Sequence, residues 1–194
     1  MIKYFLRGAL ILGTTAALFS FTLPTGWYAA DNKPKSYEMG IDKGTGLDGK
    51  NTATIKSIDK KINGFGTLMQ ACKPDKFLGK RIKMSGSLKT DNVTDWAGLW
   101  LRVDKAGSQE PLSFDNMQDR QVKGTNTWKK YEIVLDVPAN ASMIAYGALL
   151  SGTGQIWFDN ISFEIVDNSV KTTGSINGDQ NEIQKEPFNL DFEK

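Results

Sequence analysis

Two tryptophans and an arginine alternate along one short segment, where they could stack on a flat polar ligand and hydrogen-bond to it. The segment Trp96–Asp104 reads WAGLWLRVD. Successive side chains of a strand point to opposite faces, so one face would carry Ala97, Leu99, Leu101 and Val103, and the other Trp96, Gly98, Trp100, Arg102 and Asp104. The first set predicts a core stripe, and the second predicts a face for a ligand such as a sugar ring. The alternative is a strand buried on both faces, with both indoles filling a second apolar layer.

A second group of aromatic and polar residues lies in the next segment, LSFDNMQDR at 112–120. An aromatic surface beside planar hydrogen-bonding groups is what a sugar-binding face requires. We therefore predict ligand contacts from five residues here: Phe114, Asp115, Asn116, Asp119 and Arg120. The alternative is a bend whose polar side chains cap its own backbone.

The absence of histidine removes several classes of chemistry. With no histidine in the chain, Ser-His-Asp and Cys-His nucleophilic catalysis are excluded, as are the usual His/Cys zinc sites. No glycine-rich loop of the nucleotide-binding kinds is present, so nucleotide chemistry has no phosphate cradle. A pair of carboxylates acting as a glycosidase remains possible on paper, but we predict a protein that is not an enzyme.

The net charge limits the kinds of partner, and the cysteine content limits how the fold can be stabilised. The formal net charge is +2, from 24 basic and 22 acidic residues, which is too small to predict a nucleic-acid partner. Cys72 is the single cysteine, so no internal disulfide can form. We expect Cys72 to be a buried or half-buried apolar residue, and the fold to depend on packing.

The pattern along the chain predicts an all-β protein, an antiparallel β-sandwich of the jelly-roll kind. Short alternating runs recur between Gly, Asn, Asp and Pro, and helical periodicity is nearly absent after residue 30. The expected strands are Tyr37–Asp42, Asn51–Ser57, Phe65–Cys72, Lys80–Lys89, Ala97–Asp104, Leu112–Met117, Lys129–Asp136, Met143–Ser151 and Gln155–Val166.

The two ends of the chain differ from the sandwich in composition. Residues 1–23 have a basic start and an apolar run, which predicts a helical signal peptide or an uncleaved membrane anchor, and hence export. The binding domain would span 24–167, and the Asn-, Ser- and Gly-rich segment 168–187 would be a flexible polar segment. Residues 188–194 read FNLDFEK, which predicts a strand docking on the sandwich or, through 188–193, exchanging with a neighbouring molecule.

Eight segments together resemble a bacterial non-catalytic jelly-roll domain of the galactose-binding-like and carbohydrate-binding module superfamily. They are GWY (26–28), YEMGID (37–42), INGFGTLMQ (62–70), GKRIKMSGSLKTDNV (79–93), WAGLWLRVD (96–104), LSFDNMQDR (112–120), WKKYEIVLDVP (128–138) and GQIWFDNISFEI (154–165). Similar domains precede secreted tail-specific serine peptidases and erythromycin-esterase-like proteins, or accompany AraC-type regulators. In that family an Asn-x-x-Phe-Glu strand precedes the Gly-Trp segment, whereas here NLDFE stands at 189–193.

The resemblance implies a non-catalytic exported module that binds carbohydrate or a cell-surface polymer. It also implies a structural calcium ion held in part by Asp159, although its oxygen partners are not evident in the sequence. The alternative function is a structural, protein-interaction or sensor domain of a regulator or peptidase system, without sugar binding. Contact with a membrane would come only from the N-terminal segment.

Overall fold

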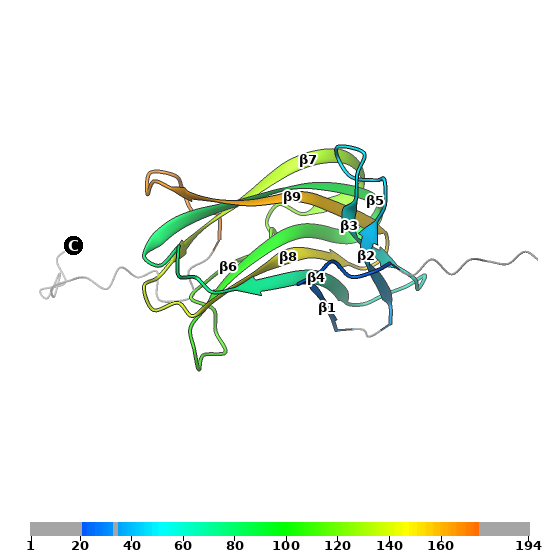
Figure 1. Ribbon diagram of the computed structural model, residues 1–194. Coiled ribbons are helices and arrows are strands. Elements are labelled where there is room, and N and C mark those ends of the chain that lie inside the picture. The colour runs from blue at the N-terminus through cyan, green and yellow to red at the C-terminus, as the bar shows by residue number, and fades with distance from the viewer. Residues whose placement is uncertain (1–20, 33–34, 175–194) are drawn as a thin grey trace, which may run out of the picture.

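Antiparallel strands make up the regular structure of the computed structural model, which describes residues 21–32 and 35–174 (Figure 1). The described part of the chain contains nine strands and no helix: β1 (Tyr28–Asp31), β2 (Tyr37–Asp42), β3 (Thr52–Ser57), β4 (Phe65–Cys72), β5 (Lys80–Asp104), β6 (Ser113–Asp115), β7 (Val122–Val137), β8 (Met143–Ser151) and β9 (Gln155–Val166). The prediction of an all-β protein is therefore confirmed for these residues.

The long strand β5 belongs to both layers of the sandwich. Its first half pairs with β9 and β7, and its second half, from Trp96 to Asp104, pairs with β8 and β6. This produces a sheet of β2, β3, β9, β5 and β7, called sheet I, and a sheet of β1, β4, β8, β5 and β6, called sheet II. In Figure 1, β7 and β9 lie in the upper layer and β4 and β8 in the lower one. The arrangement is consistent with the predicted jelly-roll sandwich.

The core between the sheets follows the alternation of the strands. Ala97, Leu99, Leu101 and Val103 are fully buried there, as the sequence pattern predicts. The first half of β5 contributes Ile82, Met84 and Leu88 to the same cluster, which sheet II completes from β4 and β8. Every residue of this stripe faces inward, so the alternate residues of β5 must face away from the core.

Two predicted strands are in fact one. Lys80–Lys89 and Ala97–Asp104 are joined by residues 90–96, which continue β5 through three register shifts between Leu88 and Ala97. The linking residues are mostly polar and so look like a turn, but bulges let a strand bend while it stays paired. β7 likewise begins earlier than predicted, at Val122, and β1 was not predicted.

The chain packs against the sandwich beyond the end of β9. The Nη1 group of Arg81 donates to the carbonyl oxygens of Asn168 and Val170, each at 2.7 Å. The amide of Thr173 donates to the carbonyl of Val134 at 2.9 Å. Residues 168–174, the described part of the predicted flexible segment, therefore contact both β5 and β7.

Several predictions fall on residues that the structure does not describe. These are the leader, apart from residues 21–23, and the C-terminal strand at 188–194. In the described ranges, no helix has the length and hydropathy needed to cross a bilayer.

Candidate functional site

The face of sheet II that points away from the core forms a groove of about 950 Å³. All five strands of the sheet contribute side chains to it, together with the loop that follows β5. The lining residues are Tyr28, Ala30, Phe65, Thr67, Met69, Trp96, Trp100, Arg102, Asp104, Lys105, Ala106, Ser108, Gln109, Phe114, Asn116, Ser142, Met143, Ala145, Leu149 and Ser151. The apolar residues of this face form a cluster separate from the main core.

Strand β5 supplies the residues that the sequence placed on this face. Trp96, Trp100 and Arg102 all line the groove, because they alternate with the buried stripe. Trp100 forms its floor and is 7% exposed. Its indole Nε1 donates to the hydroxyl of Thr67 at 2.8 Å, and that hydroxyl donates to the carbonyl of Ala148 at 2.8 Å. The ring is thus fixed in orientation, with one side towards the groove.

Two glycines lie within the strands that form the groove. Gly147 of β8 lies in register between Met69 of β4 and Trp100 of β5. Gly98 of β5 likewise stands opposite Leu149 of β8. An added Cβ at Gly147 would meet the backbone of Leu68 and Met69, and one at Gly98 would meet Met117 and the Asn116 carbonyl oxygen. The two glycines therefore allow neighbouring chain to approach sheet II closely, which the strand register shows and the sequence pattern does not.

Exposed aromatic and apolar side chains form the rim. Tyr28 is 45% exposed, and Phe65 and Met143 are each 40% exposed. Trp96 and Phe114 are partly buried against the floor. The sequence reasoning missed Tyr28 and Phe65, which lie on β1 and β4 far from the tryptophan segment. The alternation of Phe65, Thr67 and Met69 indicates that these three side chains share one face of β4. It does not indicate which strand pairs with β4, and so it does not place them beside the tryptophans.

One end of the groove carries a charged pair. The guanidinium of Arg102 donates through Nε to Oδ1 of Asp104 at 2.7 Å, and through Nη2 to the carbonyl of Gln109 at 3.0 Å. Asp104 is 7% exposed. The pair ties β5 to the following loop, which also brings Lys105 and Ser108 to the groove. The site thus combines an aromatic surface with fixed donors and acceptors, which suits a flat ligand rich in hydroxyl groups.

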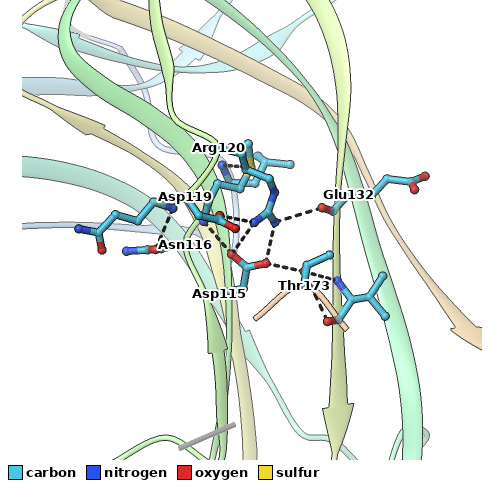
Figure 2. A network of polar contacts seen from close by, with 10 residues as sticks. Asp115, Asn116, Asp119, Arg120, Glu132 and Thr173 are labelled. Carbon is cyan, nitrogen blue, oxygen red and sulfur yellow. Dashed lines mark hydrogen bonds and ion pairs between the residues drawn. The ribbon is translucent and has the colours of Figure 1, made fainter. Parts of the chain in front are cut away.

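The second predicted group divides between two sides of β6. Phe114 and Asn116 line the groove, whereas Asp115 points to the opposite side and is 6% exposed. Its carboxylate accepts from Nη1 and Nη2 of Arg120 at 3.1 and 2.6 Å, and from the amide of Met117 at 2.8 Å. Figure 2 shows this carboxylate between Arg120 and Thr173, whose hydroxyl also donates to it.

The structure places Asp115, Asp119 and Arg120 outside the groove lining, so the groove gives no support to ligand contacts from these three residues. Asp119 reaches outward and accepts from Nη1 of Arg120 at 2.8 Å. The alternative interpretation, a bend that caps its own backbone, describes the segment better: the amides of Met117 and Gln118 bond to Asp115 and Asn116. Alternation along β6 separates Asp115 from its neighbours.

Asp159, the predicted calcium ligand, accepts two backbone amides. Oδ1 accepts from Asn160 at 2.7 Å and Oδ2 from Leu47 at 3.2 Å. Within the described ranges, no three His, Cys, Asp or Glu side chains are grouped as a metal site would require. Calcium needs six to eight oxygens, so its binding at Asp159 stays a prediction and plays no part in the function proposed below.

Comparison with known proteins gives one close relative and many structures of similar fold. No family model matches the sequence. The chain is 44% identical over 171 residues to an uncharacterised HTH-type transcriptional regulator of Bacillus subtilis, YbfP, and the match covers 87% of this chain. It covers 57% of the regulator, so this chain corresponds to a little over half of that protein.

Two solved structures share the fold over 73% of the chain. One is a xylanase of Clostridium thermocellum, Xyn10B, described as its CBM22-1 and GH10 modules complexed with xylohexaose, with a TM-score of 0.54 at 12% identity and 26% of its length covered. The other is the enzymatically active domain of tailspike protein 4 from bacteriophage CBA120, with a TM-score of 0.53 at 13% identity and 20% covered. At these identities the likeness establishes the β-sandwich fold alone.

Proposed function

We propose that this domain binds carbohydrate or a cell-surface polymer in the groove of sheet II and does not transform it. The observation that supports this most directly is the joint presence of aromatic faces and a fixed polar pair on one concave face. Sugar rings present apolar faces to aromatic side chains and hydroxyl groups to charged hydrogen-bond partners. Trp96, Trp100 and Tyr28 can supply the first kind of contact, and Arg102 with Asp104 the second.

The extent of the groove favours a chain of sugars over a single sugar. Its lining runs across every strand of sheet II, from Tyr28 on β1 to Phe114 on β6. A volume of about 950 Å³ lies at the upper end of the range for small-molecule sites, roughly 300–1,000 Å³. The xylanase with a similar fold is described as a complex with xylohexaose, which supports an oligosaccharide as the class of ligand.

The side chains of the groove favour binding over hydrolysis. Among the described residues that line it, Asp104 is the one carboxylate, and it is paired with Arg102. Glycoside hydrolysis commonly requires two carboxyl groups on opposite sides of the scissile bond. The chain also has no histidine to act as a base. We therefore infer a non-catalytic role for this domain.

A glycan array with purified protein tests the proposal, followed by titration of the best ligand. We expect Trp96→Ala to weaken that binding by about tenfold or more, the loss typical of an aromatic hot spot. The matched control is Trp128→Ala, which removes a partly buried tryptophan of sheet I that does not line the groove. Trp100 is less suitable, because its burial and its bond to Thr67 would mix a loss of stability with a loss of binding.

The proposal fails if the wild-type protein binds no glycan on a broad panel, or if the Trp96 and Trp128 variants bind equally well. Turnover of a bound glycan would contradict the non-catalytic part. In that case Asp104→Asn would show whether the groove carboxylate takes part.

A second candidate is a sensor domain of a transcriptional regulator. The 44% identity to the Bacillus subtilis regulator over 171 residues favours it. In this role the groove would hold a signal rather than anchor the protein to a polymer. Export or membrane anchoring through residues 1–23 stays part of either proposal, and fractionation of cells producing the full chain tests it.

A further inference from the structure

The short strand β6 connects the groove to the end of the described chain. Phe114 and Asn116 line the groove from one side of the strand. Asp115, between them, holds Arg120 and Thr173 on the other side (Figure 2). Any shift of β6 that moves the two groove residues must therefore also move the carboxylate that holds Thr173.

The segment 168–174 contacts β6 directly as well as through this carboxylate. Thr173 forms hydrogen bonds to Val134 through its amide and its hydroxyl: its amide donates to the Val134 carbonyl at 2.9 Å, and its hydroxyl accepts from the Val134 amide at 2.9 Å. At Gly174, an added Cβ would lie 2.3 Å from the carbonyl oxygen of Phe114. The end of the segment thus packs between β7 and β6, and a side chain at Gly174 would clash with β6.

Strand β6 is three residues long and is held at both ends. Within the described residues it pairs with Leu101–Val103 of β5, and the Ser113 hydroxyl donates to the Asp136 carbonyl of β7 at 2.7 Å. The turn after it holds Met117 at φ 62° while the side chain is fully buried. A long side chain in this region of backbone space is strained and persists only where its surroundings enforce it. The Asp115 carboxylate accepts from the Met117 amide, and the Met117 sulfur accepts from the Leu99 amide of β5, so both contacts hold this turn in place.

We propose that Asp115 and Thr173 are positioning residues for the groove: the docked segment 168–174 holds β6 where Phe114 and Asn116 meet the ligand. This inference rests on the proposed function of the groove. Thermodynamic linkage makes the effect reciprocal, so a ligand that contacts β6 strengthens the docking of 168–174. Occupancy of the groove would then be transmitted to residues 168–174.

The first test measures the affinity of three variants for the glycan that the wild-type protein binds best. Thr173→Val removes the hydroxyl that joins Asp115 to Val134, and we expect at least about fivefold weaker binding, the lower end of ordinary coupling. Thr173→Ser keeps the hydroxyl and is expected to bind as the wild type does. The matched control is Thr125→Val, whose hydroxyl also joins an aspartate, Asp91, to a backbone amide, that of Asn92.

The second test needs no ligand. Hydrogen–deuterium exchange of residues 168–174 is measured in the wild type, in Phe114→Ala, and in Tyr28→Ala as a groove control on the strand farthest from β6. We expect faster exchange in the Phe114 variant alone. Equal affinities for the wild type and Thr173→Val, or unchanged exchange in Phe114→Ala, would overturn the coupling. A wild-type protein that binds no glycan would instead overturn the proposed function, and the exchange experiment would then decide the coupling by itself.

Discussion

Asp115 is a buried carboxylate whose partners come from its own turn and from Thr173, which is far away in sequence. Its side chain is 4% exposed and accepts from Arg120, from Thr173 and from the amide of Met117. Removing one partner of a buried charged pair leaves the other without compensation. We therefore expect Asp115→Ala to lower the free energy of unfolding by about 2–4 kcal/mol, measured by urea denaturation.

Asp119 provides the matched control for that measurement. It bonds to the same guanidinium but its side chain is 74% exposed, so water replaces the interaction at little cost. We expect Asp119→Ala to change stability by less than about 1 kcal/mol. Equal losses in the two variants would show that burial does not strengthen the Asp115 contact.

Cys72 is exposed, so the prediction that it is buried or half-buried is wrong. Desolvation by the surrounding chain nevertheless raises the pKa of its thiol, against a smaller opposing effect of Lys76. A raised pKa means a smaller thiolate fraction at any given pH, and the thiolate is the nucleophile. The rate of alkylation by iodoacetamide should therefore reach its midpoint at a higher pH than for a free cysteine peptide. A midpoint equal to that of the peptide, or below it, would contradict this.

At the scale of the element, the spacing of β4 and β8 depends on Gly147. An added Cβ there would lie 2.3 Å from the Leu68 carbonyl oxygen and 2.9 Å from the Met69 Cα. These are backbone atoms of the paired strand and cannot move without parting the two strands. We expect Gly147→Ala to cost at least about 2 kcal/mol of unfolding free energy.

Gly107→Ala is the control, because it carries the general cost of replacing a glycine without the steric clash expected at Gly147. The φ of Gly107 is 75° and an added Cβ would meet no atom within 4 Å, so Gly107→Ala should cost only the left-handed strain, about 1 kcal/mol. Thermal and urea denaturation of the two variants compare them directly. If Gly147→Ala proved as mild as Gly107→Ala, β4 and β8 would be less tightly fixed than their register indicates.

The alternation of residues along β5 predicted which face of the strand each side chain occupies. It placed Trp96, Trp100 and Arg102 on one face of β5 and the buried stripe on the other, and the structure agrees. The same rule, applied to residues 114–116, would have separated Asp115 from its neighbours. Alternation alone does not identify the partner of Asp115 beyond this segment, because Thr173 is far away in sequence.

At the scale of the whole molecule, the groove depends on which strands are neighbours. Tyr28 and Phe65 reach the same face as Trp96 only through the order β1, β4, β8, β5. That order joins strands distant in sequence, and alternation within one strand contains no information about it. The sequence therefore predicted the all-β fold and the β5 residues that line the groove, while the rim of the groove and the contacts of residues 168–174 required the topology.

Because β5 belongs to both sheets, we expect the two sheets to unfold together. Its 25 residues contribute one half to each sheet, and both halves pack into the same core cluster. Neither sheet can lose its order without removing a central strand from the other, so we expect a single cooperative transition. Amide NMR signals from β3 and β9 in sheet I and from β4 and β8 in sheet II should disappear at the same urea concentration. If signals from sheet II were lost first, the bend of β5 would act as a boundary between two units, and the groove could unfold while sheet I remained intact.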